Sequence, residues 1–172
     1  QNVNGNCHGL ITPKEDCTIP HNDNGDLAWY FPCKLFNQDG SSKPNFTVEY
    51  SPGWDCHTSD AEREAFYSLK SAAEVYFTWD GIKNSSRNLA VFNGHVLDLD
   101  LLDWLETDQL NVPSMFDDLK SSSLQGYDLS LILSTDHEKK VARCLTEIIR
   151  VGEVDSKSVG CIASDVVLYV SL

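Results

Sequence analysis

Several elements that mark enzymes and membrane proteins are missing from this chain. It contains no Gly-x-Ser-x-Gly element, no phosphate-binding loop and no His-Glu-x-x-His sequence, so these common catalytic signatures are excluded. It opens on the polar stretch Gln1–Asn4, where an exported protein would first carry an apolar signal. The apolar run Val166–Leu172 is too short to cross a bilayer alone, because a span takes roughly 20 residues. We therefore interpret the chain as a mature product or as a segment of a larger protein.

Basic residues are also scarce. The 172 residues include 13 Lys and Arg against 26 Asp and Glu, which gives a formal net charge of −13. A surface this acidic repels phosphate backbones and anionic headgroups, so nucleic acid is excluded as a partner. Because hydrophobic residues make up 41% of the chain, we expect one folded globular domain with room for a small appendage.

Cysteines are present, but never as a Cys-x-x-Cys pair. The six are Cys7, Cys17, Cys33, Cys56, Cys144 and Cys161. Zinc sites prefer short paired spacings, so the even number favours disulfides over metal binding. The weaker alternative is a zinc site formed by Cys7, Cys17, His8 and His21. Proximity in the sequence favours the pairs Cys7–Cys17, Cys33–Cys56 and Cys144–Cys161.

Two sequons support an oxidising compartment. Asn45-Phe46-Thr47 and Asn84-Ser85-Ser86 each have the acceptor pattern for N-linked glycans, which makes Asn45 and Asn84 candidate glycosylation sites. Together with the six cysteines they predict that the chain faces the secretory lumen or the cell exterior.

The chain divides into three regions by composition. Residues 1–57 are rich in turn-forming residues and cysteines, and we expect a loop-rich extension there, with short strands at Trp29–Phe31 and Phe46–Tyr50. Residues 58–165 alternate short strands with helices, which is typical of an α+β domain. Residues 166–172 are either a buried terminal strand or the start of a transmembrane helix.

The middle region opens with a helix and a hairpin. A capping box at Ser59–Glu62 predicts a helix of about three turns. Glu74–Thr78 is expected to be a strand. Leu89–Phe92 and His95–Leu99 are two further strands, because Asn93-Gly94 between them suits a tight turn.

The remaining helices are predicted from caps and apolar spacing. Asp100–Glu106 is a short helix, and Pro113 suits the first position of the next one. Tyr127–Leu133 is helix or strand. A capping box at Thr135–Glu138 starts the clearest helix of the chain, and Gly152 fits as its end.

Three polar or aromatic groups are candidates for chemistry. Asp98-Leu99-Asp100 is similar to the Asp-x-Asp element of many glycosyltransferases, but here we interpret it as a strand end and helix cap. His21–Asp26 has some features of a calcium loop, and we interpret it as an ordinary polar turn. Trp29 and Trp54 are candidates for stacking on sugars, although packing is the favoured interpretation. Core packing is expected for Trp79 and Trp104 as well.

The stretch Thr78–Leu105 resembles the opening of a cytochrome b5 domain. It has a Trp-led turn, an Arg before an apolar strand, an Asn-Gly hairpin and a strand that ends in Asp-Leu. The resemblance implies a small mixed sheet with short helices and a haem held by two histidines. The available histidines are His8, His21, His57, His95 and His137. The His-Pro-Gly-Gly turn that supplies one ligand is absent after Leu105, so we expect no haem and no other cofactor.

A longer pattern resembles the extracytoplasmic domain of fungal chitin synthases of the class IV kind. The matching stretches are Phe31–Asn45, Cys56–Leu105 and Lys139–Leu172. The resemblance implies a non-catalytic module, with no catalytic or metal-binding residue of its own, in an enzyme that transfers N-acetylglucosamine from UDP-N-acetylglucosamine to chitin. It also implies a position on the luminal or extracellular side of the plasma membrane or of a secretory vesicle. The implied partners are the transmembrane helices of the parent enzyme and either nascent chitin or an assembly factor.

Two other classes remain open. One is an independent secreted protein stabilised by disulfides, in which Val166–Leu172 would be a strand. The other is a haem-binding or ligand-binding module of the cytochrome b5 kind.

Overall fold

The fold is organised around a four-stranded sheet. The computed structural model describes residues 5–48 and 59–155 of the chain. The strands lie in the order β4-β8-β6-β5, and β4 and β8 are parallel while the other neighbours are antiparallel. Their bounds are Tyr76–Phe77 for β4, Leu89–Phe92 for β5, His95–Asp98 for β6 and Arg150–Val154 for β8. Together with the helices, the sheet confirms the mixed α+β class.

The β5–β6 hairpin confirms the prediction from the Asn-Gly pair. Asn93 and Gly94 both have positive φ angles, 50° and 80°, which two-residue hairpin turns require. All four residues of β5 are buried, as are the last three of β6, so this hairpin is covered on both faces. Burial on both faces explains why the sequence of β5 is a continuous apolar run instead of an alternating one.

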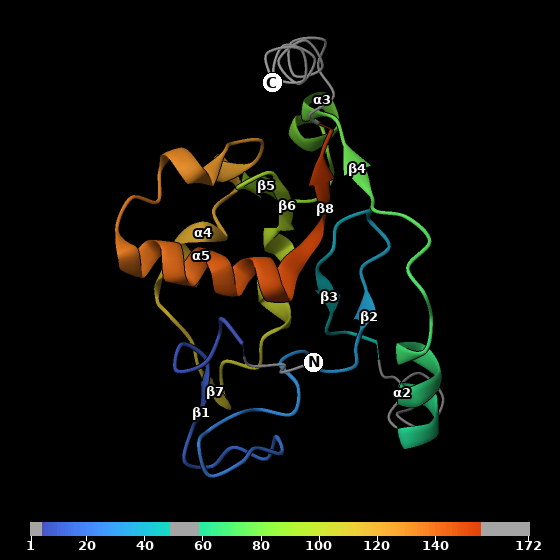
Figure 1. The fold of residues 1–172 in the computed structure, drawn as a ribbon, viewed down its shortest axis with the longest axis vertical. Coiled ribbons are helices and arrows are strands. Elements are labelled where there is room, and N and C mark those ends of the chain that lie inside the picture. Colours follow the sequence, from blue (N-terminus) through green and yellow to red (C-terminus); the bar gives the residue numbers. More distant parts are fainter. Residues whose placement is uncertain (1–4, 49–58, 156–172) are drawn as a thin grey trace, which may run out of the picture.

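Helix α5, Asp136–Ile149, packs across the core beside the sheet (Figure 1). Thr135 and Glu138 form the predicted capping box, which satisfies backbone N–H groups at the start of the helix. Val141, Leu145 and Ile149 lie on its buried face. The prediction of this helix is confirmed.

The predicted end of α5 at Gly152 is wrong. The helix ends at Ile149, and the chain passes directly into β8, a strand that was not predicted from the sequence. Gly152 lies inside β8, where an added Cβ would collide with the carbonyl oxygen of Val75 and the ring of Phe77. The glycine is therefore required by the close approach of the β4 segment, and not by a helix terminus.

The other helices are short. They are α3 (Trp79–Lys83), η1 (Leu99–Trp104), α4 (Met115–Leu119), η2 (Ser122–Leu124) and η3 (Leu129–Leu131), of which the three η elements are 3₁₀ helices. The helix expected at Asp100–Glu106 is thus η1, which begins one residue earlier, ends two residues earlier and is more tightly wound. Pro113 lies before the N-cap Ser114 and not in the first helical turn. The ambiguous segment Tyr127–Leu133 contains η3.

The N-terminal segment shares its core with the rest of the chain. Strand β1 (Thr12–Pro13) pairs with β7 (Leu110–Asn111), and β2 (Leu35–Phe36) pairs with β3 (Pro44–Asn45). Trp29–Phe31 is not a strand, and the described part of Phe46–Tyr50 is not one either. The N-terminal segment contributes the buried side chains of Cys7, Ile11, Ile19, Leu27 and Tyr30. They belong to the same apolar cluster as the buried face of α5. Apolar burial as well as covalent bonding therefore attaches this segment.

Helix α2, Asp60–Tyr67, lies apart from that core (Figure 1). The predicted capping box of Ser59 and Glu62 is present, but the helix is eight residues long, shorter than three turns. Every α2 residue whose exposure is described is exposed, including Phe66 and Tyr67. The segment that follows is exposed as far as Tyr76. Short helices that bury no surface contribute little to global stability.

The two capping boxes give the first prediction. We expect Thr135→Ala to lower the free energy of unfolding by about 1 kcal/mol, because it removes an N-cap from a helix that is packed in the core. The matched change Ser59→Ala removes the same kind of cap from the exposed α2 and should leave the global value within error. Urea denaturation followed by circular dichroism measures both. Equal losses in the two variants would contradict the expected independence of α2 from the core.

Candidate functional site

Asp98 and Asp100 place two buried carboxylates where β6 passes into η1. Asp98 is fully buried and Asp100 is nearly so. Oδ1 of Asp98 accepts a hydrogen bond from the backbone N–H of Asp100 at 3.2 Å, which caps the first turn of η1. The interpretation of Asp98-Leu99-Asp100 as a strand end and helix cap is confirmed.

The charge of Asp98 is compensated from two sides. The hydroxyl group of Ser42 donates a hydrogen bond to Oδ2, and Nε of Arg87 lies 3.9 Å from the same oxygen. Burial raises the pKa of Asp98, and the nearby charge of Asp100 adds to that rise. The Ser42 hydrogen bond and the Arg87 charge act in the opposite direction but do not cancel it.

Asp100 connects two further segments. Its Oδ2 accepts from the backbone N–H of Asn88 at 3.2 Å, and its Oδ1 lies 3.9 Å from Nζ of Lys43. The side-chain amide of Asn88 donates to the carbonyl oxygen of Lys120 at 3.0 Å. We refer to Asp98, Asp100, Ser42 and Asn88 as the carboxylate cluster. It joins the N-terminal segment, the β5–β6 hairpin and the chain that follows α4.

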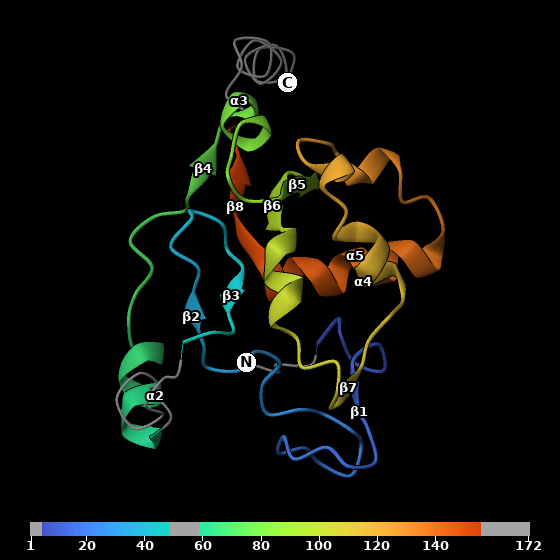
Figure 2. The same ribbon diagram turned by 180° about the vertical axis from the view of Figure 1, so that it is seen from behind.

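Ser42 also contacts the aromatic core. Its carbonyl oxygen accepts a hydrogen bond of 2.7 Å from Nε1 of Trp104, and the Trp104 ring lies 4.7 Å from the ring of Phe36 in β2. Seen from behind, η1 lies between the β2–β3 hairpin and α5 (Figure 2). The prediction that Trp104 fills the core is confirmed. Ser42 itself was missed, because it sits in a polar turn with no periodicity or motif to distinguish it.

The geometry of the cluster suits a structural role. An Asp-x-Asp element that binds a metal-nucleotide must present its oxygens to the ligand, whereas these oxygens receive hydrogen bonds from the chain itself. In the part of the chain that the structure describes, no three His, Cys, Asp or Glu side chains gather where they could hold a metal ion. The cluster can hold segments together, and its described geometry supports no catalytic step.

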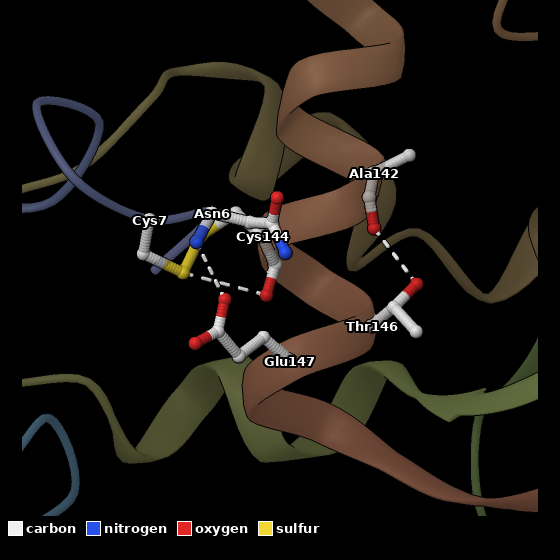
Figure 3. The surroundings of a disulfide bond; sticks show 6 residues. All are labelled: Asn6, Cys7, Ala142, Cys144, Thr146 and Glu147. Atoms are coloured by element: carbon white, nitrogen blue, oxygen red, sulfur yellow. Dashed lines mark hydrogen bonds between the residues drawn. A yellow bond between two sulfur atoms is a disulfide. The ribbon is translucent and has the colours of Figure 1, made fainter. Parts of the chain in front are cut away.

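A disulfide joins the N-terminal segment to α5 (Figure 3). The sulfur atoms of Cys7 and Cys144 are 2.05 Å apart, although 137 positions separate the two residues in the sequence. Beside this bond, the backbone N–H of Asn6 donates to Glu147 at 2.6 Å. Burial, reinforced by the charge of Glu147, raises the pKa of the neighbouring Tyr30 to about 12. The N-terminal segment is thus attached to α5 both covalently and by hydrogen bonding.

The predicted local disulfides are therefore wrong in two cases. The Cys7–Cys144 bond excludes the pairs Cys7–Cys17 and Cys144–Cys161, and Cys17 has a free, half-buried thiol. Sequence proximity failed because the loop around Cys7 folds back onto α5, where the Cα atoms lie 4.6 Å apart. Cys33 is disulfide-bonded, but Cys56 and Cys161 lie outside the described residues, so the pair Cys33–Cys56 stays a prediction.

The same bond excludes a zinc site that includes Cys7, because a cysteine in a disulfide has no thiolate to bind the metal. His8 lies 2.9 Å from a carboxylate oxygen of Asp26, and a hydrogen bond from Asn22 together with this contact lowers the pKa of Asp26. Asn22 also accepts from the backbone of Asp26 at 2.9 Å. These hydrogen bonds form a polar turn at His21–Asp26.

The described histidines do not fit a haem. A haem of the cytochrome b5 kind takes two opposed imidazoles inside an apolar pocket. His8, His21 and His137 are exposed, and His95 is half-exposed, with Nδ1 3.5 Å from Glu153 of β8. His57 lies outside the described residues.

The tryptophan candidates differ in how far their side chains are buried. Trp29 is half-buried against the core, which favours packing over sugar stacking, and Trp54 lies outside the described residues. Trp79 is 41% exposed at the start of α3, so its predicted role in the core is wrong. Only Ile82 of α3 is buried, which leaves the first turn of that helix at the surface.

Both sequons lie at accessible positions. Asn45 ends β3 half-exposed, and its Oδ1 accepts from the Thr47 hydroxyl group at 2.7 Å. Asn84 is exposed at the C-cap of α3. Glycosylation of either residue remains a prediction.

The chain is similar to one segment of fungal chitin synthases. Residues 75–153, from the β4 segment into β8, match the family model of the chitin synthase 4-like domain. Over the whole chain, identity is 76% to chitin synthase 3 of Saccharomyces cerevisiae, 58% to chitin synthase 3 of Candida albicans and 57% to chitin synthase C of Emericella nidulans. All of this chain is covered, but it spans only 14–15% of the length of these relatives. No solved structure matches it.

The disulfide gives the second prediction. Replacing both Cys7 and Cys144 by Ser should lower the free energy of unfolding by about 2–5 kcal/mol, because the bond closes a very long loop in the unfolded chain. Cys17→Ser serves as the control and should change it by less than about 0.5 kcal/mol. Urea denaturation measures all three proteins. A loss no larger in the double variant than in the control would contradict the assigned pairing.

The raised pKa of Asp98 gives the third prediction. The folded state holds this proton more tightly than the unfolded state, so the contribution of Asp98 to stability falls as the pH rises from about 3.9 through the folded pKa. Asp98→Asn removes this titration. The free energy of unfolding of wild type relative to the variant should therefore decline from pH 4 to pH 7. A difference that rises with pH would show that the charged form is the one the fold stabilises.

Proposed function

We propose that this chain is a non-catalytic, extracytoplasmic module of a chitin synthase, which supports folding and assembly of the parent enzyme. One observation carries the proposal: Asp98 and Asp100, the residues most similar to a transferase motif, are buried and bonded to other segments of the same chain. Carboxylates used in this way hold a structure together and leave no group to bind a substrate.

The reaction belongs to the parent enzyme. The relatives are named as chitin synthases, and the corresponding activity is transfer of N-acetylglucosamine from UDP-N-acetylglucosamine to a growing chitin chain. This chain corresponds to about one seventh of such a protein. Its share of the task is to stabilise the assembled enzyme or to assist export of the polymer.

The module lies on the luminal or extracellular side of the plasma membrane or of a secretory vesicle. The Cys7–Cys144 bond supports this location, because structural disulfides persist in oxidising compartments. The accessible sequon residues Asn45 and Asn84 support it as well. Transmembrane helices of the parent would supply the membrane attachment. Among residues 5–48 and 59–155, no helix has the length and apolarity needed to span a bilayer.

The core is a cytochrome b5-like frame that has lost its cofactor. Support comes from the β5–β6 hairpin, its Asn93-Gly94 turn and the Asp98 cap of η1, which occur in the expected order. The interior beneath them is filled by the side chains of Leu99, Phe116 and Leu145.

Support of assembly is preferred to contact with chitin. Sugar binding through Trp29 would require an exposed ring, but Trp29 packs against the core. We assign the transmembrane helices of the parent and factors that assist its export as the partners of the module.

A test in the parent enzyme gives the fourth prediction. Asp98→Ala should reduce the amount of chitin synthase at the cell surface several-fold, because a loss of about 1–2 kcal/mol is enough to change abundance by that factor. Turnover per enzyme molecule at the surface should stay unchanged. Surface labelling and radiometric chitin synthesis measure the two quantities.

Asp108→Ala, at an exposed position, is the control and should alter neither quantity. Normal surface amounts of the Asp98 variant with reduced turnover would assign the module to catalysis and contradict the proposal.

A further inference from the structure

One end of the sheet gathers several segments that are distant in sequence. Strands β4 and β5 both run in the same direction as β8. The C-terminal ends of all three strands therefore lie at the same end of the sheet. The backbone N–H of Asp155, just after β8, donates to the carbonyl oxygen of Phe77 at 2.8 Å. The N–H of Asn93, just after β5, donates to the hydroxyl group of Ser130 in η3 at 2.8 Å. The ends of β4, β5 and β8 and the helix η3 therefore meet there.

This end exposes large apolar side chains. Leu131 is 86% exposed and the adjacent Ile132 is 49% exposed, on either side of the end of η3. Trp79 begins α3, two residues beyond Phe77, and its ring is also at the surface. We call Trp79, Leu131 and Ile132 the apolar rim. Within the described domain, the Leu131 side chain is left in contact with water. It becomes buried only if another surface packs against it.

The apolar rim lies close to the C-terminal end of β8, and this position indicates which surface covers it. Asp155 lies at this end, and residues 156–172, which follow it in the sequence, include the apolar run Val166–Leu172. Under the proposed function, that continuation leads to the membrane. The rim is then the part of the domain nearest to the bilayer, and a Trp beside aliphatic side chains is the composition found at membrane interfaces.

We propose that the apolar rim rests in the interfacial layer of the bilayer, beside the point where the chain approaches the membrane. The charged residues at this end determine which lipid headgroups are favoured. Asp80 and Asp155 are exposed there, with Lys83 as a basic neighbour, so a zwitterionic surface is favoured over an anionic one. The contact orients the domain on the membrane surface. The inference rests on the proposed function only through the membrane attachment of the parent.

Vesicle flotation with the 172-residue chain tests this contact. Leu131→Asp should reduce the fraction bound to phosphatidylcholine vesicles about five- to tenfold, since an aliphatic side chain would be replaced by a charge at the interface. Leu69→Asp is the matched control. Leu69 is 71% exposed just after α2, which lies at the other end of the molecule from α3 (Figure 1). Its binding should equal that of wild type, and adding phosphatidylserine should weaken binding of all three proteins.

A second measurement reports the contact directly. Brominated phosphatidylcholine should quench tryptophan fluorescence in the wild-type chain, and Trp79→Phe should abolish most of that quenching while Trp29→Phe preserves it. Equal binding of the Leu131 and Leu69 variants, or quenching that survives in Trp79→Phe, would overturn the rim as a membrane contact. Failure of the wild-type chain to float, or dissociation of a dimer by Leu131→Asp, would overturn it as well. None of these results bears on the surface amounts of the parent enzyme, so the proposed function would stand or fall separately.

Discussion

The hydrogen bond between Ser42 and the buried carboxylate of Asp98 is the contact on which the arrangement of this chain depends. A charged group removed from water is costly unless several donors compensate it, and here they come from the N-terminal segment, the loop that precedes β5, and η1. The N-terminal segment has little regular secondary structure. Its position is set by this cluster, by the Cys7–Cys144 bond and by the apolar side chains it contributes to the core.

These constraints give the carboxylates and histidines of the described residues structural partners. The two carboxylates that could have met a substrate are turned into the protein, and the described histidines lie at or near the surface in contact with polar groups of this chain or with solvent. The outer surface of the described domain differs from this interior. There, α2 and the apolar rim carry large side chains that the described domain does not cover. The chain spans about one seventh of the length of the relatives it matches.

Local patterns predicted several elements well. The β5–β6 hairpin, its turn residues, the start of α5 and the cap at Asp98 all depend on residues no more than nine positions apart, and each is where the sequence placed it. The failures involve contacts between distant residues. Gly152 looked like a helix end, yet it is required by the approach of Val75 and Phe77. Trp79 was predicted to lie in the core. In the structure it begins the short helix α3, in which Ile82 is the buried residue, and the Trp79 side chain is at the surface.

The amino-acid sequence by itself determined the α+β class, the main helix, the central hairpin and the similarity to fungal chitin synthases. Spacing, caps and turn residues are local properties, so they can be read along the chain. The partner of Cys7, the use of Ser42 and the gathering of three strand ends beside Leu131 were decided only by the tertiary structure. Each joins residues tens of positions apart, and no local preference records which distant segments will meet once the apolar core has formed.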